Sequence, residues 1–176
     1  MNPTTEDRLQ RLEERLLRLE DEAAVHRLIV RYGLAVDAGD AEAAMALFTE
    51  DTIYDVGAVK TGLEDGASKP LIMRGRAAVG EMVKSAAHQR LLPNSAHTIG
   101  PVVAEVDGDQ ARATGYTRIY HLESGDYRLF RIAVNHWQLR REDGIWLIHR
   151  RVSRVLGSDE VQSIMREALG DGTGPS

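Results

Sequence analysis

One carboxylate in the sequence stands where a carboxylate is costly. Asp37 follows directly after Leu34–Val36, near the end of the helical segment "RYGLAVDAGD", whose spacing otherwise favours burial. A buried carboxylate loses its hydration and is tolerated only when a partner donates hydrogen bonds to it. Asp37 is therefore either a residue at the rim that caps the helix, or one half of a pair that performs acid–base chemistry.

Six histidines are the other side chains that could exchange protons near neutral pH. They are His26, His88, His97, His121, His136 and His149. None of them stands in the HxxxH, HExxH or HxH spacing that presents metal ligands from one helix or strand. The sequence also contains no GxSxG elbow, no GxxxxGK[ST] loop and no GxGxxG motif. We therefore expect acid–base chemistry without a metal or another cofactor.

Length and composition restrict the class of protein. A chain of 176 residues predicts one domain with a real core, and a net charge of −5 argues against a nucleic-acid or anionic-membrane partner. The absence of cysteine excludes disulfides, thiolate metal sites and thiol nucleophiles, and it fits a cytoplasmic protein. No apolar run reaches the roughly 18 residues that span a bilayer, and the N-terminus has no signal-peptide pattern.

Two helical patterns precede Asp37. Residues 8–23 form a short heptad seam, with Leu9, Leu12, Leu16 and Leu19 at alternating spacings of three and four. We expect residues 1–20 to be a helical arm packed on its own domain or on a neighbouring subunit, or else a solvated extension. Residues 21–38 follow as a second helix that ends at Gly39. Its apolar stripe consists of Val25, Leu28, Ile29, Tyr32 and Val36.

The remaining chain changes from helical to strand periodicity. Short helices are expected after Asp40, an N-cap residue, and over residues 75–91, with a strand at 52–56 and a loop or a frayed hairpin at 57–70. From His97 onward, hairpins turn at Asp107-Gly108 and at Asp143-Gly144. Helices followed by hairpins indicate an α+β fold, with one curved sheet wrapped around the N-terminal helices and a central pocket. The domain is expected over residues 21–157, with a tail at 158–176.

The order of several motifs resembles the SnoaL-like part of the NTF2-like superfamily. The run "AAVHRLIVRYGLAVDAGDAEAAMALFTEDTIYD" is similar to its opening, in which a first helix leads through a short second helix into "LF-x-(D/E)-D-x-x-Y". The later "GR" before a helix, "AHTIG" and "RREDGIWLIHRR" also resemble that family, so the similarity extends from about Glu22 to Leu156. The resemblance implies an NTF2-like cone. It points to bile-acid 7α-dehydratase, hexachlorocyclohexane dehydrochlorinase and scytalone dehydratase, which are cofactor-free lyases.

In those lyases a histidine at a strand start pairs with an aspartate at the end of the first helix. The resemblance assigns these roles to His97, in "NSAHTIG", and Asp37. It also assigns a catalytic tyrosine to Tyr32, and to Arg151 the strand arginine that holds a leaving group. The stretch between Asp37 and His97 is longer in this chain than in those lyases, chiefly at residues 57–70. This difference affects the expected substrate more than the expected pairing of Asp37 with His97.

The pair also makes physical sense. A carboxylate beside an imidazole fixes its tautomer and stabilises its protonated form, which leaves the other ring nitrogen free to accept a substrate proton. The alternative is that Asp37 caps a helix end while His97 hydrogen-bonds to backbone at a strand start.

Other candidate residues have two interpretations each. Tyr54 could donate to a substrate oxygen, or be a core tyrosine with a solvated hydroxyl. Tyr116 and Tyr120, which share a strand face with Arg118, could line the pocket and bind substrate. Asn135 and Trp137 share one face of their strand, and the indole fits the core better. His121, His136 and His149 are expected to be structural or surface residues.

These observations predict a dehydratase-type lyase that acts on a small hydrophobic, alicyclic or polycyclic substrate. An isomerase or polyketide cyclase could use the same pocket. A non-catalytic ligand-binding module, or a protein like the small subunit of a ring-hydroxylating dioxygenase, is the alternative from another class, because this fold often serves such roles. We expect a homo-oligomer, either a dimer or a trimer.

Overall fold

Helix α1 (Thr5–Asp37) is continuous in the computed structural model, which describes residues 4–58 and 70–170. A capping box closes its first turn, because Thr4 and Asp7 exchange hydrogen bonds between side chain and backbone. The residue pattern predicts an arm followed by a separate helix. The two join because residues 20–24 contain neither glycine nor proline, so the chain has no local reason to stop.

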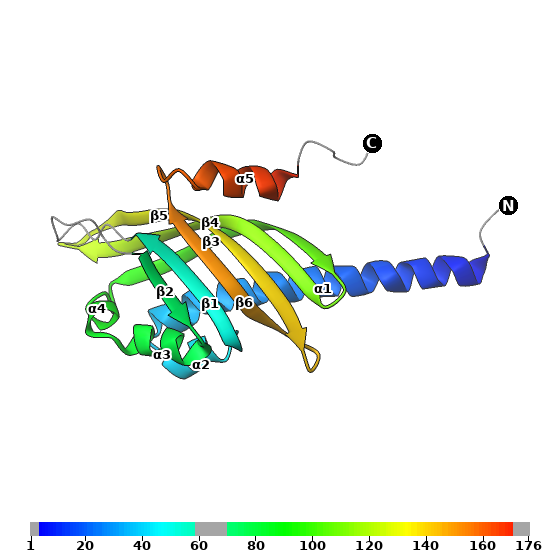
Figure 1. The fold of residues 1–176 in the computed structure, drawn as a ribbon, viewed down its shortest axis with the longest axis horizontal. Coiled ribbons are helices and arrows are strands. Elements are labelled where there is room, and N and C mark those ends of the chain that lie inside the picture. The colour runs from blue at the N-terminus through cyan, green and yellow to red at the C-terminus, as the bar shows by residue number, and fades with distance from the viewer. Residues whose placement is uncertain (1–3, 59–69, 171–176) are drawn as a thin grey trace.

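The two halves of α1 lie in different environments. The predicted stripe from Val25 to Val36 is buried, which confirms that prediction. The arm projects beyond the edge of the sheet (Figure 1). Its seam leucines Leu9, Leu12, Leu16 and Leu19 remain 56–60% exposed. Within the described residues, the arm therefore does not pack on its own domain.

Six strands form one curved sheet in the order β2–β1–β6–β5–β4–β3 (Figure 1). The strands are β1 (Phe48–Ala58), β2 (Pro70–Arg74), β3 (Ser95–Asp107), β4 (Gln110–Glu123), β5 (Asp126–Glu142) and β6 (Ile145–Val155). All neighbours are antiparallel except β1 and β6, which are parallel. Both predicted hairpins are present, but the first turns at Gly108-Asp109, one residue later than predicted, because Asp107 still pairs with Gln110. At the second, Asp143 and Gly144 both have positive φ, as a two-residue hairpin requires.

The core lies between α1 and the face of the sheet that α1 crosses, hereafter the inner face. Trp137 and Leu139 of β5 and Ile148 of β6 are fully buried against Ile29 and Val36 of α1 in one cluster. Alternation along each strand places every second residue on this face. The inner face is therefore the place where strand side chains and the end of α1 can meet.

Three short helices close one end of the fold beside the end of α1 (Figure 1). They are α2 (Ala41–Met45), α3 (Arg76–Lys84) and α4 (Ala86–Gln89). Asp40 caps α2, as predicted, by accepting from the N–H of Ala43 at 2.9 Å. The helix predicted over residues 75–91 is divided at Ser85, which has extended backbone and caps α4 instead.

Two elements were not predicted from the sequence. Strand β2 begins at Pro70, the end of the predicted 57–70 loop, of which residues 59–69 lie outside the described residues. Helix α5 (Val161–Leu169) replaces much of the predicted tail and lies over the outer face, opposite to α1 (Figure 1). Residues 171–176, also predicted as tail, are outside the described part. Among residues 4–58 and 70–170, no helix combines the length and apolar character that crossing a bilayer requires.

A bidentate ion pair joins β1 to β6 next to Tyr54. Arg154 donates to both carboxylate oxygens of Asp55, at 2.9 and 2.8 Å, and the two side chains are 12% and 14% exposed. Its hydrogen bonds hold the pKa of Asp55 below the ordinary value. The stabilisation is therefore fully present above the unfolded-state pKa and is lost as pH falls through the lower folded-state pKa.

Asp55→Asn is expected to lower the free energy of unfolding by about 2–3 kcal/mol at pH 7, because Arg154 loses its buried charged partner and keeps only the exposed Glu160. The difference from wild type should shrink as the solution is made strongly acidic, since wild-type Asp55 then becomes protonated. Urea unfolding at neutral and at strongly acidic pH measures both values. An equal difference at the two pH values would contradict the assignment.

Candidate active site

The end of α1 and the start of β3 bring one carboxylate and one imidazole together. Asp37 Oδ1 lies 2.6 Å from His97 Nδ1, and Asp37 Oδ2 accepts the backbone N–H of His97, also at 2.6 Å. The two side chains are 21% and 13% exposed. Because one carboxylate oxygen accepts the backbone N–H and the other contacts the ring, Asp37 fixes both the backbone position of His97 and the orientation of its imidazole.

This contact determines which ring nitrogen can react. With Nδ1–H donating to Asp37, the neutral ring keeps an unprotonated Nε2, to which no described residue hydrogen-bonds. Such a nitrogen can take a proton, and the adjacent carboxylate stabilises the imidazolium that forms. The geometry is thus that of a general base with its orienting group.

Gly33 makes the close approach of α1 and β3 possible. A Cβ at position 33 would stand 2.8 Å from the carbonyl oxygen of His97 and 3.7 Å from its Cβ. Gly33 lies one turn before Asp37, so the helix contacts β3 at the point where the carboxylate must reach the ring. A glycine at this position is therefore part of how the pair is assembled.

Gly33→Ala is expected to destabilise the protein by about 1–3 kcal/mol, because a backbone oxygen cannot give way to the new methyl group. The gain in helix propensity, about 1 kcal/mol, does not offset this clash. Urea unfolding measures the effect. Gly80→Ala is the matched control: it is also a helical glycine, but its new Cβ meets the flexible end of Met45. Equal stabilities of the two variants would show that the approach is not tight.

Two further side chains support the pair and were not identified from the sequence. The buried ring of His88, on α4, donates from Nε2 to the carbonyl oxygen of Val36, next to Asp37, at 2.8 Å, and its centroid is 6.3 Å from that of His97. Since a carbonyl only accepts, Nε2 of His88 carries the proton. Ser95 makes a long contact, 3.5 Å, with Asp37 Oδ1. No spacing in the sequence distinguishes His88 from a surface histidine.

A buried arginine lies farther along the inner face. Arg151 of β6 is 3% exposed, and its Nε donates to Asn135 Oδ1 at 3.0 Å. Asn135 is fully buried and donates to Thr117 Oγ1 at 2.6 Å, so a polar chain crosses β6, β5 and β4. Nη1 of Arg151 is buried and has no hydrogen-bond partner within the described part of the chain.

Three aromatic rings surround the Arg151 guanidinium. Its carbon lies 4.3 Å from the ring centroid of Tyr32, 4.6 Å from that of Tyr54 and 5.6 Å from that of Trp137. Tyr32 and Tyr54 share one hydrogen bond of 3.2 Å between their hydroxyl groups, so one proton of the two remains free to donate elsewhere. Burial, and then Tyr54, raise the pKa of Tyr32 far above its ordinary value, so this hydroxyl stays protonated.

Two predicted substrate-binding tyrosines lie on the wrong face. In the β3–β4 register His97 pairs with Ile119 and Ala96 pairs with Tyr120, so Tyr120 points away from the dyad side. Tyr116 lies on that same outer face and contacts Met165 of α5. The prediction that Tyr116 and Tyr120 line the site with His97 is therefore wrong, because strand alternation directs both to the outer face.

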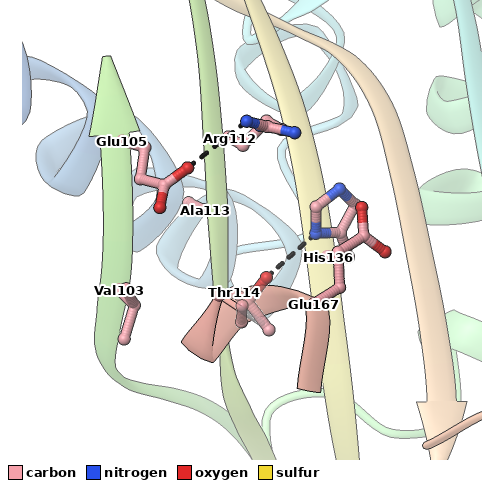
Figure 2. Close-up of a pocket in the computed structure, with 9 residues that line it drawn as sticks. Val103, Glu105, Arg112, Ala113, Thr114, His136 and Glu167 are labelled. Carbon is pink, nitrogen blue, oxygen red and sulfur yellow. Dashed lines mark hydrogen bonds and ion pairs between the residues drawn. The ribbon is translucent and has the colours of Figure 1, made fainter. Parts of the chain in front are cut away.

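The outer face carries its own cleft, of about 200 Å³, between α5 and strands β3–β5 (Figure 2). Figure 2 shows His136 hydrogen-bonded to Thr114, 2.9 Å away, with Glu167 of α5 nearby. Burial lowers the pKa of His136. This cleft includes none of the predicted site residues. Within the described residues, no three His, Asp or Glu side chains gather as they would to hold a metal ion.

Comparisons with known proteins identify the family. A family model for the SnoaL-like domain matches residues 17–152. The chain belongs to the SnoaL-like family. This SnoaL-like chain is also similar to an NTF2-like protein with a cystatin-like fold from Novosphingobium aromaticivorans. The two are 32% identical over 90% of this chain and 97% of the other, with a TM-score of 0.79.

More distant solved structures share the fold of the SnoaL-like chain. A candidate scytalone dehydratase from Novosphingobium aromaticivorans is 18% identical over 78% of this chain and 85% of its own, with a TM-score of 0.62. The beta subunit of a candidate aromatic-ring-hydroxylating dioxygenase from the same organism is 19% identical over 79% and 91%, with a TM-score of 0.62. Among curated proteins, none is significantly similar in sequence.

Proposed function

We propose that this SnoaL-like protein is a cofactor-free lyase that eliminates water, or a similar leaving group, from a small alicyclic or polycyclic substrate. The observation that carries the proposal is the pairing of Asp37 with His97, in which both carboxylate oxygens hold one histidine while none of the described residues hydrogen-bonds to its Nε2. A base oriented in this way suits removal of a proton from carbon next to an electron-withdrawing group.

We assign proton removal to His97, and departure of the leaving group to the cluster around Arg151 farther along the inner face. His97 Nε2 takes the proton from carbon and becomes imidazolium, which Asp37 stabilises. The electron pair of the broken C–H bond forms the new double bond, and the C–O bond to the leaving hydroxyl breaks. The Tyr32–Tyr54 hydroxyl pair, with Arg151 against both rings, supplies the hydrogen bond and charge that favour departure of hydroxide. The hydroxide becomes water when the imidazolium of His97 returns the proton to it, which also restores the neutral base.

The test is incubation in D₂O with a panel of alicyclic and polycyclic β-hydroxy ketones, followed by mass spectrometry. Wild type should convert at least one compound to a product lighter by one water, and His97→Gln should not. Incorporation of solvent deuterium without loss of water would indicate an isomerase or cyclase in place of the lyase. Tight binding with neither change would indicate a non-catalytic module.

The exposed arm bears on a second candidate in that last class, a subunit-type protein that binds a larger partner. Its leucine seam is uncovered in the single chain, and the fold is shared with a candidate dioxygenase beta subunit. We propose that the arm contacts a second copy of the chain in a homo-oligomer, whereas a subunit-type protein would instead need a different, larger partner. Light scattering of the purified protein separates the two, because only self-association yields an oligomer from the chain alone.

A further inference from the structure

A second arginine shares the inner face with Arg151. Arg131 of β5 stands in a cross-strand row with Ile119 of β4 and His97 of β3, so its side chain leaves the sheet on the same side as the proposed base. Its Nη2 makes a long contact, 3.5 Å, with the carbonyl oxygen of Val56 on β1. The guanidinium thus extends toward the Tyr54 and Arg151 end of the face.

Three other partly buried arginines are neutralised by carboxylates, and the two without such a partner among the described residues, Arg118 and Arg150, lie on the outer face. Arg140, Arg141 and Arg154 each form an ion pair with a carboxylate. Among residues 4–58 and 70–170, neither Arg131 nor Arg151 has a carboxylate partner. Burial lowers the pKa of Arg131, and the nearby charge of Arg151 acts in the same direction. Two positive charges are therefore held close together without a counter-charge from the described chain.

Two buried donors at this position also lack acceptors. They are Nη1 of Arg151 and Nε1 of Trp137, whose ring lies 5.6 Å from the guanidinium carbon. Buried donors are nearly always satisfied, so a pair without acceptors indicates that an acceptor is supplied from outside the chain. Charge and hydrogen bonding both call for the same group, an oxygen anion that can accept several N–H bonds.

We propose that Arg131 and Arg151 bind a carboxylate group of the substrate, and that Arg131 is the residue that selects for it. This inference rests on the proposed function in taking the inner face as the substrate site. Guanidinium groups suit a carboxylate because they match its planar pair of oxygens. Strands β3 and β5 are two places apart in the sheet, so the base and the carboxylate subsite are separated by about 10 Å at the backbone. The substrate is therefore an alicyclic hydroxy acid.

Calorimetric titration with cyclohexanecarboxylate and its neutral analogue, cyclohexanecarboxamide, tests the inference. Wild type should bind the carboxylate at least about tenfold more tightly. Arg131→Met should abolish most of that preference and leave the amide affinity unchanged. Arg131→Lys, which keeps the charge but not the planar fork, should retain part of it. Arg128→Met is the matched control, since Arg128 is an exposed arginine of the same strand.

Three results would overturn the inference: equal affinities of wild type for the two probes, no binding of either, or an equal loss of both affinities in Arg131→Met. The titration does not depend on turnover. A carboxylate preference that requires Arg131, combined with no water loss from any hydroxy compound, would keep the subsite and remove the lyase. Water loss from neutral substrates without a carboxylate preference would keep the lyase and remove the carboxylate subsite.

Discussion

Asp37→Asn is expected to lower kcat by a factor of about a thousand or more while the protein stays folded. Both oxygens of Asp37 accept hydrogen bonds from His97, whereas an asparagine has only one acceptor. If the amide oxygen keeps the backbone N–H of His97, its NH₂ group faces Nδ1. The ring must then carry its proton on Nε2, and the base is lost. A wrong tautomer of this kind costs about 10⁴ in kcat in a Ser-His-Asp triad.

The tautomer can be measured without a substrate. Nitrogen-15 NMR of the histidine rings should show His97 with its proton on Nδ1 in wild type and on Nε2 in Asp37→Asn, with His97→Gln identifying the signal. Asp40→Asn is the control, because asparagine caps a helix as well as aspartate does. An unchanged tautomer in Asp37→Asn, or undiminished turnover, would remove Asp37 from the mechanism.

Arg151→Met is expected to change activity and stability in opposite directions. Loss of the guanidinium should lower kcat about a hundredfold, as loss of one charge-stabilising donor does. The free energy of unfolding should rise by about 1–2 kcal/mol, because methionine keeps contact with the aromatic rings and removes a buried charge without a carboxylate. The unpartnered oxygen left on Asn135 offsets part of this gain.

Thermal or urea unfolding beside a turnover assay measures both effects. Arg150→Met is the matched control, since adjacent strand residues point to opposite faces and Arg150 therefore lies on the outer face. It should change neither quantity by much. A marked loss of stability in Arg151→Met would mean that Arg151 serves the fold and that the charge is not held there for a ligand. A residue that lowers the stability of the fold but serves the reaction creates a trade-off between stability and activity.

The helical half of the fold could be predicted because its signals are local. The stripe from Val25 to Val36, the end at Gly39 and the cap at Asp40 each follow from a few neighbouring residues. Helix α5 also carries a local signal, because Val161, Ile164, Met165 and Ala168 follow the spacing of an amphipathic helix; the tail was instead predicted from the Gly-rich residues at its end. The separation of the arm from the second helix was wrong for a different reason: a change of environment along a helix need not interrupt it.

Site residues could be predicted from the sequence only where a single segment made them conspicuous or a family resemblance assigned them. Asp37 is conspicuous within its own helix, and the resemblance assigned His97 to it. Tyr116 and Tyr120 were placed wrongly because alternation tells which residues share a face but not which face α1 covers. Arg131 escaped notice since its position opposite His97 depends on the pairing register of three strands, which is a long-range property.

The continuity of α1 has a mechanical consequence. At 1.5 Å per residue, the helix is a rod of about 50 Å, with the exposed leucines at one end and Asp37 at the other. It contains no proline, and its single glycine lies in the buried half, so the arm has no hinge. A partner that moves the exposed leucines would therefore also move the other end of the same rigid helix, which carries the carboxylate that orients His97.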